Sequence, residues 1–301
     1  MPARRFMQLD VFSDRPMLGN PLAVVIDAQD IDDAAMQSFA RWTNLSETTF
    51  LLPPTTPEAD YRVRIFTPRQ ELPFAGHPSV GSAYAAIEAG LVDTGKSSLV
   101  QECAAGLLPV RVEGHGRARR IHVQAPPARI LEIADDLRER LAAALPARLE
   151  RDEVRLVDNG PHWLVCDLHE AHEVRTLQPD LAAVAALCGH HAAVGVSVFG
   201  RETDGTAAMA VRAFCPADGI PEDPVTGSAN AAIMAWLAAR GDTGYGLHYR
   251  ASQGREVGRD GIVDVARDAY SGAITIGGAC ALTVRGELNL TPTVLGKMPT
   301  R

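Results

Sequence analysis

The sequence predicts an α+β protein built from two related halves, and three observations support this prediction. Segments with strand character outnumber helical segments and do not alternate regularly with them, which disfavours a doubly wound parallel sheet. A stretch of the first half returns, in diverged form, in the second half. Finally, 301 residues suit two domains, and a hydrophobic content of 46% is enough to fill two cores.

The repeat is clearest in two Ala-rich stretches. Residues 77–87 (HPSVGSAYAAI) and 223–233 (DPVTGSANAAI) are identical at seven of eleven positions. Upstream, Arg64-x-Phe66-x-Pro68 answers Arg212-x-Phe214-x-Pro216, so the offset between the copies changes from 148 to 146 residues before the helical segment. We therefore expect a diverged duplication in which each copy runs from strand through loop to helix.

The individual elements follow from periodicity and composition. Strands are expected where short runs are apolar or alternate in polarity, at residues 7–12, 22–26, 48–52, 61–66, 98–102, 121–124, 163–167, 195–199, 208–214, 262–266, 273–276 and 281–285. Helices are expected at residues 32–42, 135–144 and 180–187 and in the two Ala-rich stretches. The Pro-containing stretch 125–127 is the expected hinge. It divides the chain into domains 1–127 and 128–301 and leaves open on which domain the C-terminal end packs.

The starts of the two Ala-rich helices carry the first functional hint. His77 and Asp223 each precede a proline, which predicts that they are N-caps with proline at the first helical position. Free backbone N–H groups and the helix dipole attract an anion such as a carboxylate. Gly81-Ser82 and Gly227-Ser228 follow, and such small residues let a ligand approach backbone amides. The alternative is that these residues only cap helices and let them pack closely.

Glu47 is the candidate acid or base. At an offset of 149, residues 46–50 align with residues 195–199, and Glu47 then lies opposite the apolar Val196. A carboxylate that enters an apolar strand is partly desolvated, which raises its pKa toward the value that a general acid or base needs. The alternative is a solvated residue at a strand end.

Composition excludes several classes of partner. With 29 basic and 37 acidic residues the net charge is −8. Lys and Arg are nowhere clustered enough in the sequence to neutralise the phosphates of a nucleic acid, so nucleic acid is not an expected partner. The only lysines are Lys96 and Lys297, which leaves almost no candidate for a pyridoxal phosphate Schiff base. Five scattered cysteines without a C-x-x-C pair fit a reducing cytoplasm. No apolar run approaches the roughly 18 residues of a membrane helix, so we expect a cytoplasmic protein.

Other chemistries find no support in the residue patterns. Cys215 is answered by Thr67 in the first half, which excludes a racemase that uses one cysteine from each half. No G-x-S-x-G or strand-linked G-x-G-x-x-G motif is present, so hydrolase and dinucleotide-binding interpretations fail. A metal site could be drawn from four residues, His162, Cys166, His169 and His172. Their spacing is not that of the helical H-E-x-x-H motif, so these residues do not predict a metal site. We expect neither metal nor cofactor.

Three segments resemble the signature segments of PhzF-like (phenazine biosynthesis isomerase) proteins. They are residues 44–50 (NLSETTF), 71–78 (ELPFAGHP) and 219–229 (GIPEDPVTGSA), in the same order and spacing as in that family. Later features resemble the family as well, namely Gln253-Gly254 followed by Gly258-Arg259, and Gly277-Gly278, so the resemblance extends over nearly the whole chain. It implies a fold similar to diaminopimelate epimerase, with two pseudo-symmetric domains, each a curved, mostly antiparallel sheet around a central helix. It also implies an active site between the domains and a homodimer.

The resemblance implies a cofactor-independent isomerase or epimerase that shifts a proton on a small cyclic carboxylate, similar to trans-2,3-dihydro-3-hydroxyanthranilate isomerase. In that scheme Glu47 transfers the proton, while His77 and Asp223 orient polar groups of the substrate. Three further residues would line the pocket near the carboxylate: Gly76, Gly227 and Ser228. The alternative is a catalytically silent small-molecule-binding or interaction protein of the same fold, which would need helix caps but not a buried acid.

Overall fold

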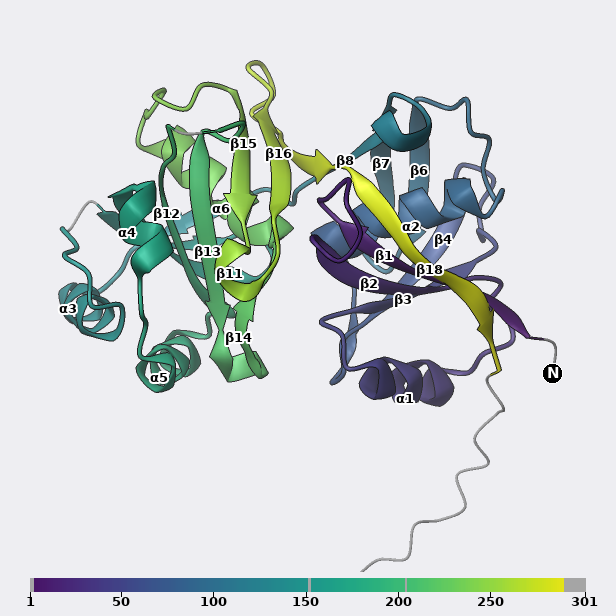
Figure 1. The fold of residues 1–301 in the computed structure, drawn as a ribbon, viewed down its shortest axis with the longest axis horizontal. Helices are drawn as coiled ribbons and strands as arrows, with labels where there is room; N and C mark the ends of the chain where they lie inside the picture. Colours follow the sequence, from purple (N-terminus) through teal and green to yellow (C-terminus); the bar gives the residue numbers. More distant parts are fainter. Residues whose placement is uncertain (1–2, 151–152, 204, 290–301) are drawn as a thin grey trace, which may run out of the picture.

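The computed structural model describes residues 3–150, 153–203 and 205–289, and Lys297 lies outside this range. The chain forms two lobes, and in each lobe strands wrap around one central helix (Figure 1). The central helix of the first lobe is α2 (Gly76–Glu88), and that of the second is α6 (Gly227–Ala239).

Both lobes are rich in strands. The strands of the first lobe are β1 (Arg4–Val11), β2 (Asn20–Val25), β3 (Thr48–Leu52), β4 (Tyr61–Phe66), β5 (Glu71–Leu72), β6 (Ser98–Cys103), β7 (Gly106–Glu113), β8 (Arg120–Gln124) and β18 (Cys280–Leu288). Those of the second are β9 (Arg129–Leu131), β10 (Val154–Asp158), β11 (His162–Glu170), β12 (Gly195–Arg201), β13 (Met209–Cys215), β14 (Ile220–Asp223), β15 (His248–Gln253), β16 (Gly261–Arg267) and β17 (Ile274–Gly278). The outer helices are α1 (Asp33–Thr43), α3 (Asp135–Ala144), α4 (Ala171–Thr176) and α5 (Leu181–His191).

The strand pairing repeats between the lobes. Most neighbours are antiparallel, and each lobe has two parallel pairs at matching places: β2–β3 and β4–β6 in the first, β11–β12 and β13–β15 in the second. The lobes are joined by the antiparallel pair β8–β17, and β18 returns to pair with β1. This arrangement confirms the predicted α+β class with two pseudo-symmetric halves. The boundary after residue 127 falls between β8 and β9, and the division into separate domains there stays a prediction.

Small residues allow the central helices to lie deep in their lobes. Most of α2 and α6 is buried. A Cβ added at Gly81 would come within 2.5 Å of Leu22 and 2.8 Å of Val11, so this glycine lets α2 approach β1 and β2 closely. The interior therefore fixes the start of each helix relative to its sheet, because a shift along the helix axis would bring larger side chains into these contacts.

The registers of the strands correct the predicted counterpart of Glu47. Thr48 pairs with Phe66 in the first lobe, and Val196 pairs with Phe214 in the second. Because Phe66 and Phe214 are equivalent, Thr48 corresponds to Val196, and the residue before it, Glu47, corresponds to Gly195. The prediction that Val196 is its counterpart was wrong by one residue.

The helix starts also differ from the prediction. Both lobes contain an equivalent ion pair, with Arg64 Nε 2.7 Å from Glu71 and Arg212 Nη2 2.8 Å from Glu222. The offset is therefore 148 residues at the arginines and 151 at the glutamates, because the short 3₁₀ turn Pro216–Asp218 lengthens the second copy. The offset of 151 continues into the helices, where Gly76 corresponds to Gly227.

His77 and Asp223 are consequently not helix caps. The N-cap of α2 is Ala75, and that of α6 is Thr226, so His77 lies in the first turn of α2 and Asp223 is the last residue of β14. The sequence match had placed the two residues at one equivalent position. Sequences rich in Gly, Ala and Ser align with each other at several offsets. For this reason the sequence alignment of the two helices used an offset of 146 residues, five fewer than the offset of 151 in the structure.

Most predicted elements are present, and the missed ones are short or lack a clear alternation of polarity. The helices predicted at 32–42, 135–144 and 180–187 are α1, α3 and α5. The elements that were not predicted are β5, β7, β9, β10, β14, β15 and α4. β7 has an exposed face with Arg111 and Glu113 and contains Pro109, which hides the alternation. The polar residues at the end of β15, Ser252 and Gln253, are buried, and no pattern in the sequence predicted this burial.

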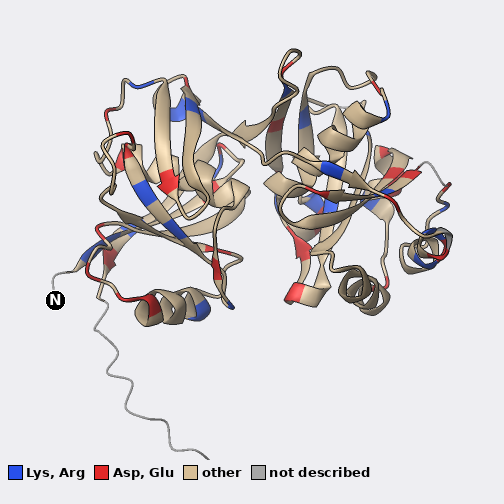
Figure 2. Ribbon diagram, turned by 180° about the vertical axis from the view of Figure 1, so that it is seen from behind, with Lys and Arg blue, Asp and Glu red and all other residues tan. Residues whose placement is uncertain are grey.

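Charged residues are distributed over both lobes. Figure 2 shows Lys and Arg interspersed with Asp and Glu, and many carboxylates have an arginine partner, such as Asp27 with Arg5 and Asp264 with Arg120. No helix in the described part of the chain has the length and apolar character that a membrane crossing requires.

Candidate active site

Glu47, His77 and Asp223 come together where the two lobes meet. Helix α1 ends at Asn44, whose left-handed backbone (φ 54°) turns the chain so that Glu47 leads into β3. His77 follows from the start of α2, and the distance from its Nε2 to Glu47 Oε2 is 3.5 Å. The charges of His77 and Glu47 both act on Asp223, which arrives from the opposite lobe.

Glu47 has the environment of a general acid or base. Only 16% of its side chain is exposed, and burial raises its pKa from the ordinary value of 4.5 to about 7. Its Oε2 atom is buried and has no hydrogen-bond partner within the described chain. At neutral pH both the carboxylate and the carboxylic acid are therefore populated, and one oxygen is left to exchange a proton with a bound molecule.

His77 is neutral near physiological pH. Burial lowers its pKa to about 4, against the opposing effect of the nearby Asp223 charge. Its Nε2 atom is buried, and it too finds no hydrogen-bond partner among the described residues. A neutral imidazole next to a carboxyl group can orient a polar group of a substrate without adding a positive charge.

Asp223 is held more firmly than Glu47. Burial raises its pKa to about 6, and His77 and the hydroxyl of Thr226 oppose this increase. Asn20 Nδ2 donates to Oδ1 at 3.0 Å, and Thr226 Oγ1 donates to Oδ2 at 2.6 Å. Gln253 Nε2 supports the same turn by donating to the backbone oxygen of Asp223 at 3.0 Å. Asp223 is therefore mostly ionised at pH 7 and fixed in orientation.

The starts of the two central helices face each other at the same place. A Cβ added at Gly76 would lie 3.9 Å from Gly227 Cα, and one added at Gly227 would lie 3.7 Å from the backbone nitrogen of His77. Both would also meet Ile276 at 3.0–3.1 Å. The unpaired N–H groups and positive dipole ends of both helices thus converge, which favours a bound anion such as a carboxylate.

Ser228 lies in the first turn of α6 and is braced from β10 and β11. Its Oγ accepts a hydrogen bond from Trp163 Nε1 at 3.2 Å, and its backbone oxygen accepts one from Asn159 Nδ2 at 2.8 Å. Neither Asn159 nor Asn20 could be singled out from the sequence, because their partners are distant along the chain. Gln253 was noted only as part of a family feature.

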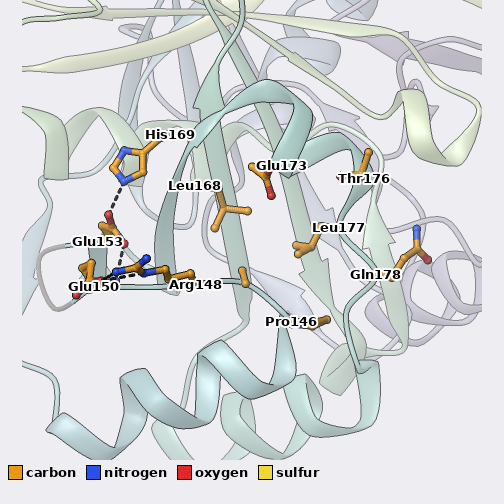
Figure 3. Close-up of a pocket in the computed structure, with 11 residues that line it drawn as sticks. Pro146, Arg148, Glu150, Glu153, Leu168, His169, Glu173, Thr176, Leu177 and Gln178 are labelled. Carbon is orange, nitrogen blue, oxygen red and sulfur yellow. Dashed lines mark hydrogen bonds and ion pairs between the residues drawn. The ribbon is translucent and has the colours of Figure 1, made fainter.

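A hollow of about 600 Å³ in the second lobe is separate from this site. It lies beside α4 and β11, and Figure 3 shows two pairs among its polar residues, Glu153 with His169 and Glu150 with Arg148. None of the predicted site residues lines it. In residues 3–150, 153–203 and 205–289, no group of three His, Cys, Asp or Glu side chains is arranged to hold a metal ion.

The fold and the site define a two-lobed α+β protein with a buried carboxyl group of raised pKa between pseudo-symmetric halves. The family model described as phenazine biosynthesis-like protein (PhzC-PhzF) matches residues 9–286. The chain therefore belongs to the PhzF family, as its signature segments predicted.

Similar proteins cover nearly the same length. The chain is 35% identical over 295 residues to antisense-enhancing sequence 1 of Schizosaccharomyces pombe, which covers 95% of this chain and 99% of that protein. It is 35% identical over 259 residues to trans-2,3-dihydro-3-hydroxyanthranilate isomerase of Pseudomonas aeruginosa, covering 85% and 87%. The crystal structure of a PhzF-family protein from Bacillus anthracis has a TM-score of 0.82 at 26% identity and covers 96% and 100%. The chain is thus a relative of named isomerases.

Proposed function

We propose that this protein is a cofactor-independent isomerase that moves a proton between two carbons of a small cyclic carboxylate. The relative from Pseudomonas aeruginosa is named for such a substrate, trans-2,3-dihydro-3-hydroxyanthranilate. The observation that carries the proposal is the position of Glu47. It is a buried carboxyl group with an unpartnered oxygen and a pKa of about 7, next to two converging helix starts.

The reaction begins with Glu47 as base. Its carboxylate removes a proton from an activated C–H group, and the electron pair of the broken bond moves into the conjugated system of the substrate. Glu47, now a carboxylic acid, returns the same proton to a second carbon of that system. The bond formed and the bond broken are both C–H bonds, so the reaction needs no oxidant, reductant or other co-reactant.

The surrounding groups stabilise the charge that develops during this shift. The starts of α2 and α6 lie close together, and their free N–H groups would hold the substrate carboxylate and the negative charge that is delocalised toward it. His77, as a neutral imidazole, and Asp223, as a fixed carboxylate, would hold the other polar groups of the substrate. These contacts orient the reacting carbons toward Glu47.

The proposal is tested by NMR in D₂O. Trans-2,3-dihydro-3-hydroxyanthranilate and a panel of small cyclic amino and hydroxy acids are incubated with wild-type protein, with Glu47→Gln, and with Glu113→Gln as a matched control at an exposed glutamate of β7. We expect isomerisation or deuterium incorporation with wild type and the control, and none with Glu47→Gln.

Two other outcomes would contradict the proposal. Equal exchange with Glu47→Gln would remove Glu47 as the base. Binding of panel compounds in a thermal-shift assay, with neither isomerisation nor deuterium incorporation by any protein, would favour the alternative of a silent small-molecule-binding protein. Binding by itself does not distinguish the two functions, whereas proton exchange does.

A further inference from the structure

Asn20 connects the two lobes at the candidate active site. It is the first residue of β2 in the first lobe, is fully buried, and donates from Nδ2 to two acceptors of the second lobe. These are Asp223 Oδ1 at 3.0 Å and the backbone oxygen of Val225 at 2.8 Å. Its own Oδ1 is buried without a hydrogen-bond partner in the described chain. An unpaired buried acceptor costs about 1–3 kcal/mol, so a residue that only filled this space would be better apolar.

The direction of these hydrogen bonds is fixed by the backbone. The oxygen of Val225 is a carbonyl and can only accept, so the NH₂ group of Asn20 must face it. The same nitrogen reaches Asp223 Oδ1, so Asn20 is necessarily a donor to that carboxyl group.

The second oxygen of Asp223 also receives a donor. The backbone nitrogen of Thr226 donates to Gln253 Oε1 at 3.0 Å, which turns Gln253 Nε2 toward the Thr226 hydroxyl at 2.9 Å. The hydroxyl proton of Thr226 is then directed to Asp223 Oδ2 at 2.6 Å. Each lobe thus supplies one donor to the carboxylate, and this arrangement favours its ionised form.

We infer that Asn20 is a positioning residue: from the first lobe it orients the Asp223 carboxylate of the second, so that Asp223 is aligned with Glu47 and His77 when the lobes meet. This inference rests on the proposed function, because such alignment matters only if the junction is the reaction site. The ionisable groups that face Asp223 are His77 from α2, Glu47 from the residue before β3 and Cys215 from β13.

The test compares Asn20→Leu, which keeps the volume but removes the donor, with Gln101→Leu. Gln101 is a fully buried amide of the same lobe whose hydrogen bonds go to Ser79 and Tyr61, and none goes to Asp223. With trans-2,3-dihydro-3-hydroxyanthranilate in D₂O, we expect Asn20→Leu to reduce kcat by on the order of tenfold or more with a smaller change in KM. Gln101→Leu is expected to lower the melting temperature without this loss of kcat.

A second measurement needs no substrate. The titration of Asp223, followed by NMR of ¹³C-labelled aspartate carboxyl groups, is expected to move to higher pH in Asn20→Leu and to stay in place in Gln101→Leu, because only the first variant removes a donor to the carboxylate. An unchanged Asp223 midpoint in Asn20→Leu would overturn the inference. If the wild type neither isomerises the probe nor incorporates deuterium into it, the proposed function fails for this substrate, and this titration still decides the role of Asn20.

If the Asn20→Leu variant does not fold, the Asn20→Asp variant takes its place in the test. A protonated aspartic acid at this position can still donate to Asp223, whereas an ionised one repels it. Where circular dichroism shows a folded protein, we expect the ratio of variant kcat to wild-type kcat to rise as the pH is lowered from about 8 to about 6. A ratio that is constant across this range would contradict a donor role for Asn20.

Discussion

The two lobes share one strand order but differ at the positions of the candidate site residues. Where the first lobe places Glu47 before β3, the second has Gly195 before Val196. A Cβ at Gly195 would come within 2.5 Å of the backbone oxygen of Phe214 and 2.8 Å of Trp163, so the second lobe has no room for an acid there. Conversely, Asp223 at the end of β14 corresponds to Leu72 in the first lobe.

The difference separates two roles that a symmetric protein would duplicate. The acid of the first lobe has an unpartnered oxygen, and the acid of the second lobe receives two side-chain donors. One carboxyl group is thus left to change its protonation state, and the other is held in place. The framework around them is shared, as the equivalent ion pairs of Arg64 and Arg212 show.

The largest expected effect concerns Glu47 itself. Glu47→Gln keeps the shape of the side chain but removes its capacity to take a proton, so kcat should fall by a factor on the order of 10² or more while KM changes little. Steady-state kinetics with the substrate found by the D₂O screen measures this. If Glu47→Gln kept the wild-type kcat, the structural difference between Glu47 and Asp223 would have no role in catalysis.

The shared ion pair should matter more in the second lobe than in the first. Arg212 and Glu222 are both buried, and Arg212 also donates to the backbone oxygens of Val174 and Leu177. Arg212→Leu leaves a buried unpaired carboxylate, and we expect a loss of about 3–5 kcal/mol in the free energy of unfolding. The equivalent Arg64→Leu should cost about 1 kcal/mol or less, since Glu71 remains solvated.

Urea denaturation of both variants measures this difference. The double variant Arg212→Leu/Glu222→Leu is the control, because it removes the unpaired charge and should recover much of the stability. Equal losses of unfolding free energy in Arg212→Leu and Arg64→Leu would show that the two ion pairs contribute equally to the stability of their lobes.

Glu47 is expected to make the wild type less stable at high pH. Its pKa is raised in the folded state from 4.5 to about 7, so the native protein binds an extra proton between these values and loses stability as the pH rises through them. Glu47→Gln should therefore be more stable than wild type by on the order of 1–3 kcal/mol above pH 7.

The gain should disappear below about pH 4.5, where the carboxyl group is protonated in both states. Denaturation curves at several pH values measure it, and Glu113→Gln provides the comparison for an exposed glutamate. A gain that is independent of pH would mean that burial does not shift the titration of Glu47.

The smallest expected effect is a change of activity with pH. With the carboxylate of Glu47 as the proposed base, kcat/KM should fall as the pH decreases below about 7, by about tenfold per pH unit once the acid form predominates. A rate that rises on acidification would instead require the protonated form of Glu47 in the free enzyme. The pH profile of wild-type protein distinguishes the two.

The sequence was sufficient for the family and the duplication, and it named candidate site residues whose roles stay a prediction. The short motifs around Glu47, His77 and Asp223 occur in the order of the family's signature segments, and apolar periodicity located most strands and helices. The sequence was not sufficient to predict the registers. Val196 was taken as the counterpart of Glu47, and His77 and Asp223 were taken as equivalent helix caps. The structure moves the first by one residue and places the other two at different kinds of position.

The physical reason is that local composition does not encode long-range register. Small residues repeat within both central helices, so their sequences match at several offsets, whereas hydrogen-bonded ladders and buried contacts such as Gly81 against Leu22 admit only one. The sequence by itself therefore determined the family and named the candidate site residues. Only the tertiary structure decided that Asn20 reaches Asp223 across the junction and that the starts of α2 and α6 converge, because those contacts join residues about 150–200 positions apart.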